Sequence, residues 1–253
     1  MRTKLPLLMN AVGTCCSVFG QVPLPSRFEV VSIKPSTEIN TNKGIRYMPD
    51  GGFRAGNYSL KDLIRLGWDV RAFQIMGGPG WLDAERYNVQ TRPDVPFNPH
   101  STEGEERLRE MVRSMLQDRF RLHVHQQKKE TNVYHLVSVQ GILKLKWTGD
   151  ARDATTQMRD AKGHRWATKF DMELLARYLG GELGFPVVDQ TGVAGVYDFE
   201  LVWNPEESRA GGKTDSLPSM VTAIREQLGL ELKRGRGQVE MVVVDYAEKA
   251  SAN

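Results

Sequence analysis

The sequence predicts an α+β protein built from two tandem related modules, each a small mixed or antiparallel sheet packed against two helices. Three observations favour this class. Apolar residues recur at helical spacing in four segments, alternating strands accompany them, and the order of these elements is the same in both halves. We expect a signal peptide at 1–20, an N-terminal strand and loop at 21–56, module 1 at 57–140, a linker at 141–165 and module 2 at 166–253.

The first helix of each module has a recognisable start. In module 1, Ser59 is followed three residues later by Asp62, which is the pattern of a capping box. In module 2, Asp171 is a favourable N-cap. The residues behind it have the i, i+3, i+4, i+7 spacing of one helical face, namely Met172, Leu175, Ala176 and Leu179.

The second helix of each module repeats one apolar stripe. In module 1 the stripe consists of Leu108, Met111, Val112 and Met115. The same spacing returns 109 positions later, from 108 to 217, as Leu217, Met220, Val221 and Ile224. Pro218 would lie in the first turn, where its missing N–H costs nothing.

Strands lie between and after these helices. Short apolar runs at 73–75 and 185–188 lead through turns into alternating strands, which carry Tyr87 and Val89 in module 1 and Tyr197, Phe199, Leu201 and Trp203 in module 2. Each second helix should then lead into a strand, a polar turn (126–132 or 233–237) and a closing strand (133–139 or 239–244). A further strand at 28–33 precedes module 1, and polar loops at 93–104 and 205–215 occupy the same place in both modules.

Residues 1–20 have the pattern of an export signal, with a basic start, a short apolar stretch and small residues before Gln21. We favour cleavage after Gly20 over lipidation of Cys15 or Cys16, because the three residues before Cys15 make a poor lipobox. We therefore predict an exported protein, periplasmic or secreted, with no transmembrane segment in the mature chain.

The composition excludes several classes of function. The chain has 34 Lys+Arg and 31 Asp+Glu, and loss of Arg2 and Lys4 with the signal would lower the net charge from +3 to +1, which does not suit nucleic-acid binding. Its 2 cysteines cannot form a disulfide framework or a four-thiolate zinc site. Because it lacks a phosphate loop, a Gly-x-Ser-x-Gly elbow and a His-Glu-x-x-His helix, we predict no cofactor.

Several sequence segments resemble those of an exported protein family of unknown function from soil bacteria. They are Phe-Glu-Val-Val-Ser-Ile-Lys-Pro-Ser at 28–36, Asn-Tyr-Ser-Leu-Lys-Asp-Leu-Ile at 57–64, Gly-Pro-Gly-Trp-Leu at 78–82, and the segments 115–122, 186–192, 195–199, 226–230 and 244–249. The match runs from about 28 to 253, with variation at Val31 and Val193. Relatives fused to membrane metallopeptidases of the β-lactam-sensing antirepressor type imply a sensing or interaction role in the envelope.

The element order of module 2 is also similar to the short N-terminal domains of secretins and TonB-dependent receptors, which bind other proteins. We therefore expect a non-catalytic protein-binding or sensing module, whose partner is an envelope protein or a cell-wall ligand. A small molecule held in the groove between the modules is one form of this hypothesis. The alternative is an envelope hydrolase that acts on sugar or peptide polymers, with or without the help of a metal ion.

The candidate metal ligands are three histidines. His123 and His125 alternate with apolar residues on one strand, so both imidazoles should point to the face opposite the core. His135 would approach them across the expected hairpin. The sequence favours a polar outer strand face over a metal site.

The candidate ligand or partner contacts lie in module 2 and the linker. Asp189, Thr191 and Asp198 would supply carboxylates and a hydroxyl, but a turn before a strand needs the same residues for side-chain to backbone hydrogen bonds, and we favour the turn. Trp147 and Trp166 lie in polar sequence, where an exposed ring is a candidate sugar or protein contact.

Overall fold

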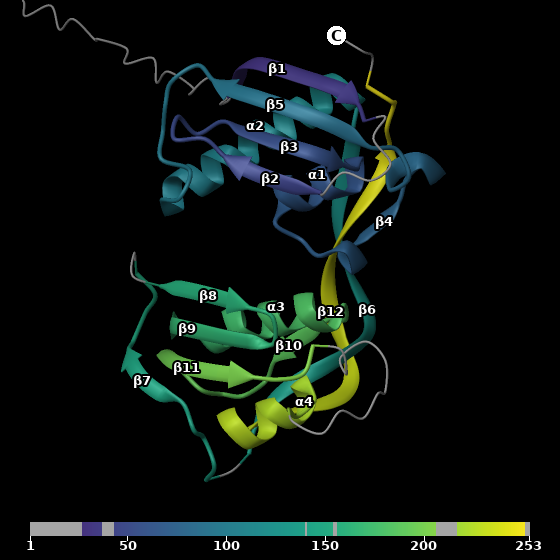
Figure 1. The fold of residues 1–253 in the computed structure, drawn as a ribbon. Coiled ribbons are helices and arrows are strands. Elements are labelled where there is room, and N and C mark those ends of the chain that lie inside the picture. The colour runs from purple at the N-terminus through teal and green to yellow at the C-terminus, as the bar shows by residue number, and fades with distance from the viewer. Residues whose placement is uncertain (1–26, 37–42, 140, 154–155, 206–216, 251–253) are drawn as a thin grey trace, which may run out of the picture.

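The computed structural model describes residues 27–36, 43–139, 141–153, 156–205 and 217–250. It confirms the α+β class: three four-stranded sheets and four helices form two lobes, which two long strands join (Figure 1). None of the helices in these ranges is long and apolar enough to cross a membrane. The predicted signal peptide and most of the loop at 205–215 lie outside the described residues.

The upper lobe in Figure 1 contains an antiparallel sheet with two helices on one face. α1 (Leu60–Trp68) and α2 (Thr102–Phe120) cover that face, and their apolar sides pack on Phe53, Tyr87 and Val89 of the sheet. Two 3₁₀ turns, η1 (Ala72–Gln74) and η2 (Gly80–Leu82), follow α1 in the sequence. The sheet order is β1 (Phe28–Pro35), β5 (Tyr87–Pro93), β3 (Phe53–Tyr58) and β2 (Gly44–Tyr47).

The lower lobe has the same construction. Its core gathers Leu175 and Leu179 from α3 (Met172–Leu183) against Phe199 and Leu201 of the sheet. α4 (Met220–Ala223) continues as a π-helical turn over Ile224–Leu228. The antiparallel sheet has the order β7 (Lys146–Gly149), β11 (Val196–Val202), β9 (His164–Phe170) and β8 (Gln157–Ala161).

A third sheet runs through both lobes. β6 (His123–Ser138) and β12 (Leu230–Tyr246) pair antiparallel over their whole length, at the right of Figure 1. β4 (Ile75–Gly77) adds in parallel to β12 beside the upper core, and β10 (Val187–Asp189) adds in parallel to β6 beside the lower core. Val133, Val239 and Met241 form a small separate core between the lobes.

The two lobes repeat one order of elements. The strand order across the upper outer sheet is β1, β5, β3 and β2, and the order across the lower outer sheet is β7, β11, β9 and β8. Strands at the same position in the two sheets also occupy the same place in the sequence of their lobe. The shared sheet has the order β10, β6, β12 and β4. If each strand is replaced by its counterpart in the other lobe (β4 for β10 and β6 for β12), the same order results, read from the opposite edge. The internal duplication stays a prediction, as do the domain boundaries, although residues 141–165 contain β7 and β8 of the lower sheet.

The polar turns predicted at 126–132 and 233–237 are wrong, because both segments are the middle of a long strand. They are polar because water reaches both faces of the ribbon there, and not because the chain reverses. Lys128 lies opposite Glu240, and Arg236 Nε binds Glu130 Oε1 at 3.0 Å, so opposite charges pair across the ribbon. The strand pairs with a segment about 110 positions away, which local pattern does not reveal.

The helix stripes are confirmed in α2 and only half correct in the second module. Leu108, Met111, Val112 and Met115 are all buried. In module 2, Ser219 caps the helix through the backbone N–H of Thr222, so Leu217 and Pro218 precede the helix. Val221 is 46% exposed, and Ala223 and Leu228 join Met220 and Ile224 in the core.

Candidate functional site

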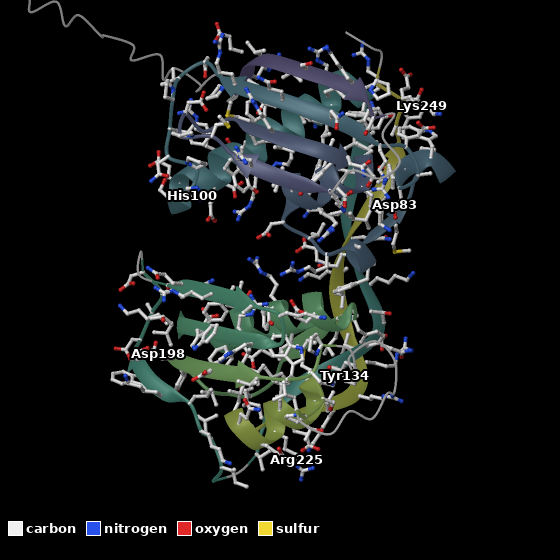
Figure 2. All side chains as sticks on the ribbon, in the orientation of Figure 1. Asp83, His100, Tyr134, Asp198, Arg225 and Lys249 are labelled. Carbon is white, nitrogen blue, oxygen red and sulfur yellow. The ribbon has the colours of Figure 1, made fainter. Side chains whose placement is uncertain are left out.

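A cavity of about 490 Å³ lies on the boundary between the two lobes. β2, the end of β3, α1, the loop before α2 and the first turns of α2 line it from the upper lobe. Arg177 of α3 lines it from the lower lobe. His100, from the loop before α2, lies on the side of the upper lobe that faces the lower lobe (Figure 2). We call this cavity the interlobe cleft.

A second cavity of about 280 Å³ shares Asp69, Arg71 and Arg177 with the interlobe cleft. It continues along α3 and β10 of the lower lobe and along η1 of the upper lobe. Both cavities therefore depend on how the two lobes are placed, and Asp69, Arg71 and Arg177 belong to both.

The interlobe cleft is rich in positive charge. Five cations (Lys43, Arg65, Arg71, Arg109 and Arg177) face three carboxylates (Asp62, Asp69 and Glu105). Tyr47, Tyr58 and His100 add hydrogen-bonding groups, and Ile45, Leu66 and Leu108 add apolar surface. Guanidinium groups with hydrogen-bonding neighbours favour carboxylate and phosphate groups as ligands.

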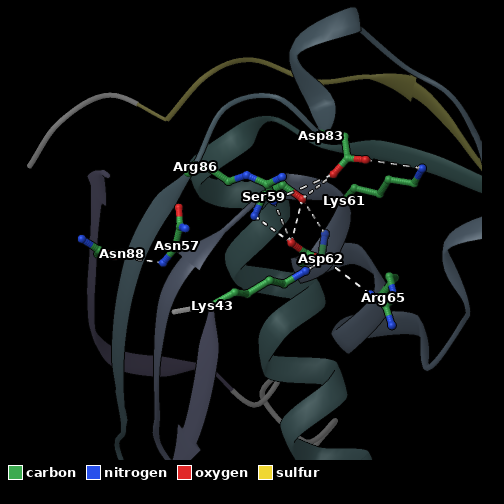
Figure 3. A network of polar contacts seen from close by, with 9 residues as sticks. All are labelled: Lys43, Asn57, Ser59, Lys61, Asp62, Arg65, Asp83, Arg86 and Asn88. Atoms are coloured by element: carbon green, nitrogen blue, oxygen red, sulfur yellow. Dashed lines mark hydrogen bonds and ion pairs between the residues drawn. The ribbon is translucent and has the colours of Figure 1, made fainter. Parts of the chain in front are cut away.

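Asp62 is the centre of a closed polar cluster at the start of α1 (Figure 3). Its carboxylate is 7% exposed and accepts the backbone N–H of Ser59 at 3.0 Å, which completes the predicted capping box. Three cations surround it: Lys43 Nζ at 2.5 Å, Arg86 Nη1 at 3.3 Å and Arg65 Nη1 at 3.4 Å. One buried carboxylate thus neutralises cations from three segments of the chain.

This environment changes the acidity of Asp62. Burial alone would raise the pKa of the carboxyl group, but hydrogen bonds from Lys43 and Ser59 outweigh it, so the pKa lies below its usual value. A carboxylate that stays ionised and fully paired at neutral pH is a poor general acid or base. The cluster therefore stabilises the lobe rather than performing proton transfer.

Asp69 joins the two lobes at the C-terminal end of α1. Its backbone is left-handed, with φ 50° and ψ 42°, which aspartate tolerates better than most residues. Its Oδ2 lies 2.7 Å from Arg177 Nη1 in the lower lobe and 3.4 Å from Arg109 Nη2 in the upper lobe. One carboxylate oxygen is therefore shared between two arginines from different lobes.

Arg71 has the least compensated charge in the cleft. Within the part of the chain that the structure describes, no carboxylate forms an ion pair with its guanidinium. Burial first, and then the positive charges of Arg177 and Arg65, lower the pKa of Arg71, although Asp69 and Glu182 act in the opposite direction. A partly desolvated guanidinium beside a second one is electrostatically unfavourable without an anion.

The two tyrosines of the cleft are held as neutral phenols. Burial raises the pKa of Tyr47, and the nearby Glu105 adds to the effect. Burial likewise raises the pKa of Tyr58, whose ring lies 5.3 Å from the Lys43 ammonium. Both hydroxyl groups can therefore donate hydrogen bonds to a ligand at neutral pH.

The predicted histidines do not come together. His123 lies near the Tyr246 ring, and the exposed His125 binds Asp245 at 2.9 Å. His135 lies on the same strand as His123, about 40 Å further along β6, because the hairpin expected between them is absent. In the described ranges, no group of three or more His, Cys, Asp or Glu could hold a metal ion.

The other predicted residues lie in the lower lobe, outside the cleft. The favoured turn is present: the backbone N–H of Thr191 donates to Asp189 at 2.9 Å, and Thr191 in turn accepts the N–H of Val193. Asp198, on the lower sheet in Figure 2, accepts the N–H of Lys169 at 3.0 Å. Trp147 and Trp166 are 59% and 40% exposed.

Sequence reasoning missed the arginines of the cleft. Arg65, Arg71, Arg109 and Arg177 are scattered singly over more than 100 positions, so no run of basic residues marks them. The sequence indicated the location of the cleft only indirectly. The loop at 93–104 carries Pro99 and His100, which line the cleft, and one form of the sequence-based hypothesis expects a ligand in a groove between the modules.

The family model described as a protein of unknown function (DUF3738) matches residues 61–247, and the chain therefore belongs to this family. No curated protein matches the chain, and no solved structure does. The family match agrees with the resemblance to a family of unknown function. The soil-bacterial origin, the metallopeptidase fusions and the likeness to secretin domains stay predictions.

Proposed function

From its place in a family of unknown function, we propose that this protein is an exported, non-catalytic sensing module that holds a small ligand in the interlobe cleft. The observation that carries the proposal is that Arg177 of the lower lobe and residues of the upper lobe line one cavity of about 490 Å³. Small-molecule sites are concave and have volumes of roughly 300–1,000 Å³. A ligand in this cleft would contact both lobes.

The link between the lobes supports sensing. At residues 127–133 and 235–241 the shared sheet consists only of β6 and β12, and more than half of the side chains there are exposed. A two-stranded ribbon with little core is easily twisted. A ligand that binds one relative placement of the lobes better than another shifts the population towards it.

The state of the cleft carboxylates favours binding over hydrolysis. Asp62 is surrounded by cations, Asp69 contacts Arg109 and Arg177, and Glu105 lies 3.3 Å from Arg109 Nη2. A carboxyl group that acts as a general acid must hold a proton at neutral pH, and each of these carboxylates instead forms an ion pair with a cation. The envelope hydrolase and the protein partner stay predictions from the sequence.

Ligand-dependent thermal stabilisation tests the proposal. We expect cell-wall fragments or β-lactams to raise the melting temperature in proportion to the logarithm of their concentration above Kd, as mass action requires. Val70→Trp should strongly weaken this response, because Val70 lines the cleft and an indole would occupy part of it. Val221→Trp is the matched control, since Val221 is 46% exposed on α4 and lies outside the cleft.

Small-angle scattering of the same samples measures the placement of the lobes. We expect saturating ligand to change the radius of gyration of the wild type and the Val221→Trp variant, but not of Val70→Trp. A ligand that stabilises Val70→Trp as well as the wild type would place the site elsewhere and refute the proposal. So would a flat melting response across the whole panel.

A further inference from the structure

We propose that the interlobe cleft recognises an oxyanion of its ligand, a carboxylate or a phosphate, through Arg71 and Arg177, and that Asp69 is an internal carboxylate that competes for Arg177. This inference rests on the proposed function and names the chemistry of its ligand. It assigns the anchoring contacts to one residue from each lobe.

Charge is distributed unevenly within the cleft. Lys43 and Arg65 both contact Asp62, and Arg109 contacts Asp69, Glu105 and Glu106. Of the nearby acids, Glu182 already binds Arg165 at 3.3 Å. The surplus positive charge therefore lies at Arg71, which forms no ion pair with a described carboxylate, and at Arg177, which shares the carboxylate of Asp69 with Arg109.

The end of α1 and a glycine of α3 position Arg71. It follows the C-terminal cap of α1 and packs against α3 of the other lobe, where Gly181 leaves room for it. A Cβ atom at Gly181 would lie only 3.0 Å from Arg71 Cζ. The absence of a side chain there lets the guanidinium rest on the helix, at the point where the two cavities share residues.

The contact between Asp69 and Arg177 is exposed to solvent. The 2.7 Å ion pair joins side chains that are 40% and 49% exposed, so water reaches both. Exposed pairs of this kind contribute about 0–1 kcal/mol, and an incoming oxyanion can replace the Asp69 carboxylate at little cost. Arg109 would still hold Asp69 after the exchange.

The rest of the cleft indicates that the ligand is larger than a simple ion. Ile45, Leu66 and Leu108 provide apolar surface, and the hydroxyl groups of Tyr47 and Tyr58 provide polar contacts. A small organic acid or a phosphorylated or carboxylated sugar combines an oxyanion with surface of this kind. The two arginines then fix the orientation of its charged end.

Titration of the full chain with three probes at matched ionic strength tests the inference: inorganic phosphate, succinate, and neutral N-acetylglucosamine. We expect phosphate or succinate to raise the melting temperature of the wild type, and calorimetry to give its Kd. A response to phosphate alone assigns a phosphate ligand, and a response to succinate alone assigns a carboxylate. N-acetylglucosamine should have a smaller effect.

Two arginine variants should weaken binding of the anion, and an Asp69 variant should tighten it. Arg71→Gln and Arg177→Gln should each weaken binding of the responding anion by at least about tenfold, which is typical for loss of a hydrogen bond to a charged group. Asp69→Asn should tighten it, by roughly threefold or more, because it removes the competing charge while asparagine tolerates the left-handed backbone. Arg92→Gln is the control, since Arg92 pairs with Glu29 outside the cleft.

The outcomes separate this inference from the function that it rests on. If N-acetylglucosamine or another neutral ligand binds in a Val70-dependent manner and Arg71→Gln leaves its affinity unchanged, the sensing function stands and the oxyanion inference is overturned. If phosphate or succinate binds but all the arginine variants respond as the wild type does, the inference is overturned as well. If no ligand of either panel stabilises the wild type, both fail.

Discussion

The Asp62 cluster and the Arg71–Arg177 pair both line the interlobe cleft, yet their charges are balanced differently. Asp62 is a buried anion surrounded by three cations and capped by Ser59. Arg71 is a partly buried cation that faces a second arginine. The first arrangement leaves nothing for a ligand to supply, whereas the second has one carboxylate, Asp69, which Arg177 shares with Arg109. Within one cleft, the local balance of charge thus distinguishes a stabilising cluster from the proposed binding site.

Among the variants that test this difference, Asp62→Ala should have the largest effect on the free energy of unfolding. Removing the carboxylate leaves three cations without their shared partner and removes the Asp62 half of the capping box at the start of α1, so we expect a loss of about 2–4 kcal/mol in the free energy of unfolding. Urea denaturation followed by circular dichroism measures it. Asp83→Ala is the matched control, since Asp83 is 62% exposed in the same network and should cost less than about 0.5 kcal/mol. Equal losses in the two variants would contradict the central role of Asp62.

The acid dependence of stability should show a smaller effect of the same group. Because the folded-state pKa of Asp62 lies below the value of about 3.9 expected in the unfolded chain, its contribution is present above that pH and is lost as the pH falls through the folded value. The difference in melting temperature between the wild type and Asp62→Asn should therefore be constant near neutral pH and shrink below about pH 4. A difference that persists unchanged into strong acid would show that ionisation of Asp62 is not its source.

The smallest expected effect is that of Arg71→Gln on stability. Because Arg71 forms no ion pair with a described carboxylate and faces Arg177, we expect the free energy of unfolding to stay within about 0.5 kcal/mol of the wild type or to rise. Thermal melts without added anions measure it. A loss as large as that of Asp62→Ala would mean that Arg71 stabilises the fold, and the contrast between the two regions would disappear.

Local sequence pattern predicted much of the fold. Ser59 and Asp62 identified the start of α1, Asp171 identified the start of α3, and alternation from Tyr197 to Trp203 identified β11. These features depend on residues within about one helical turn or strand of each other, so the pattern contains them. The expected groove between modules also lies where the cleft is found.

The same reasoning failed where distant pairing decides the structure. The polar residues at 126–132 have the composition of a turn, but β12 supplies their hydrogen-bonding partners from about 110 positions away. His135 was accordingly expected near His123, and the continuous strand separates the two residues. The Leu217 end of the second stripe failed for a local reason, because Ser219 caps the helix more strongly than the stripe extends it.

The sequence by itself determined the α+β class, the caps and the buried faces of the central strands, because periodicity and capping act over a few residues. Only the tertiary structure decided the shared ribbon of β6 and β12 and the composition of the cleft. Asp69 meets Arg177 across 108 positions, and Arg71 rests on Gly181 of the other lobe. Such contacts are set by how the lobes pack, and single arginines in a sequence do not indicate which of them will meet.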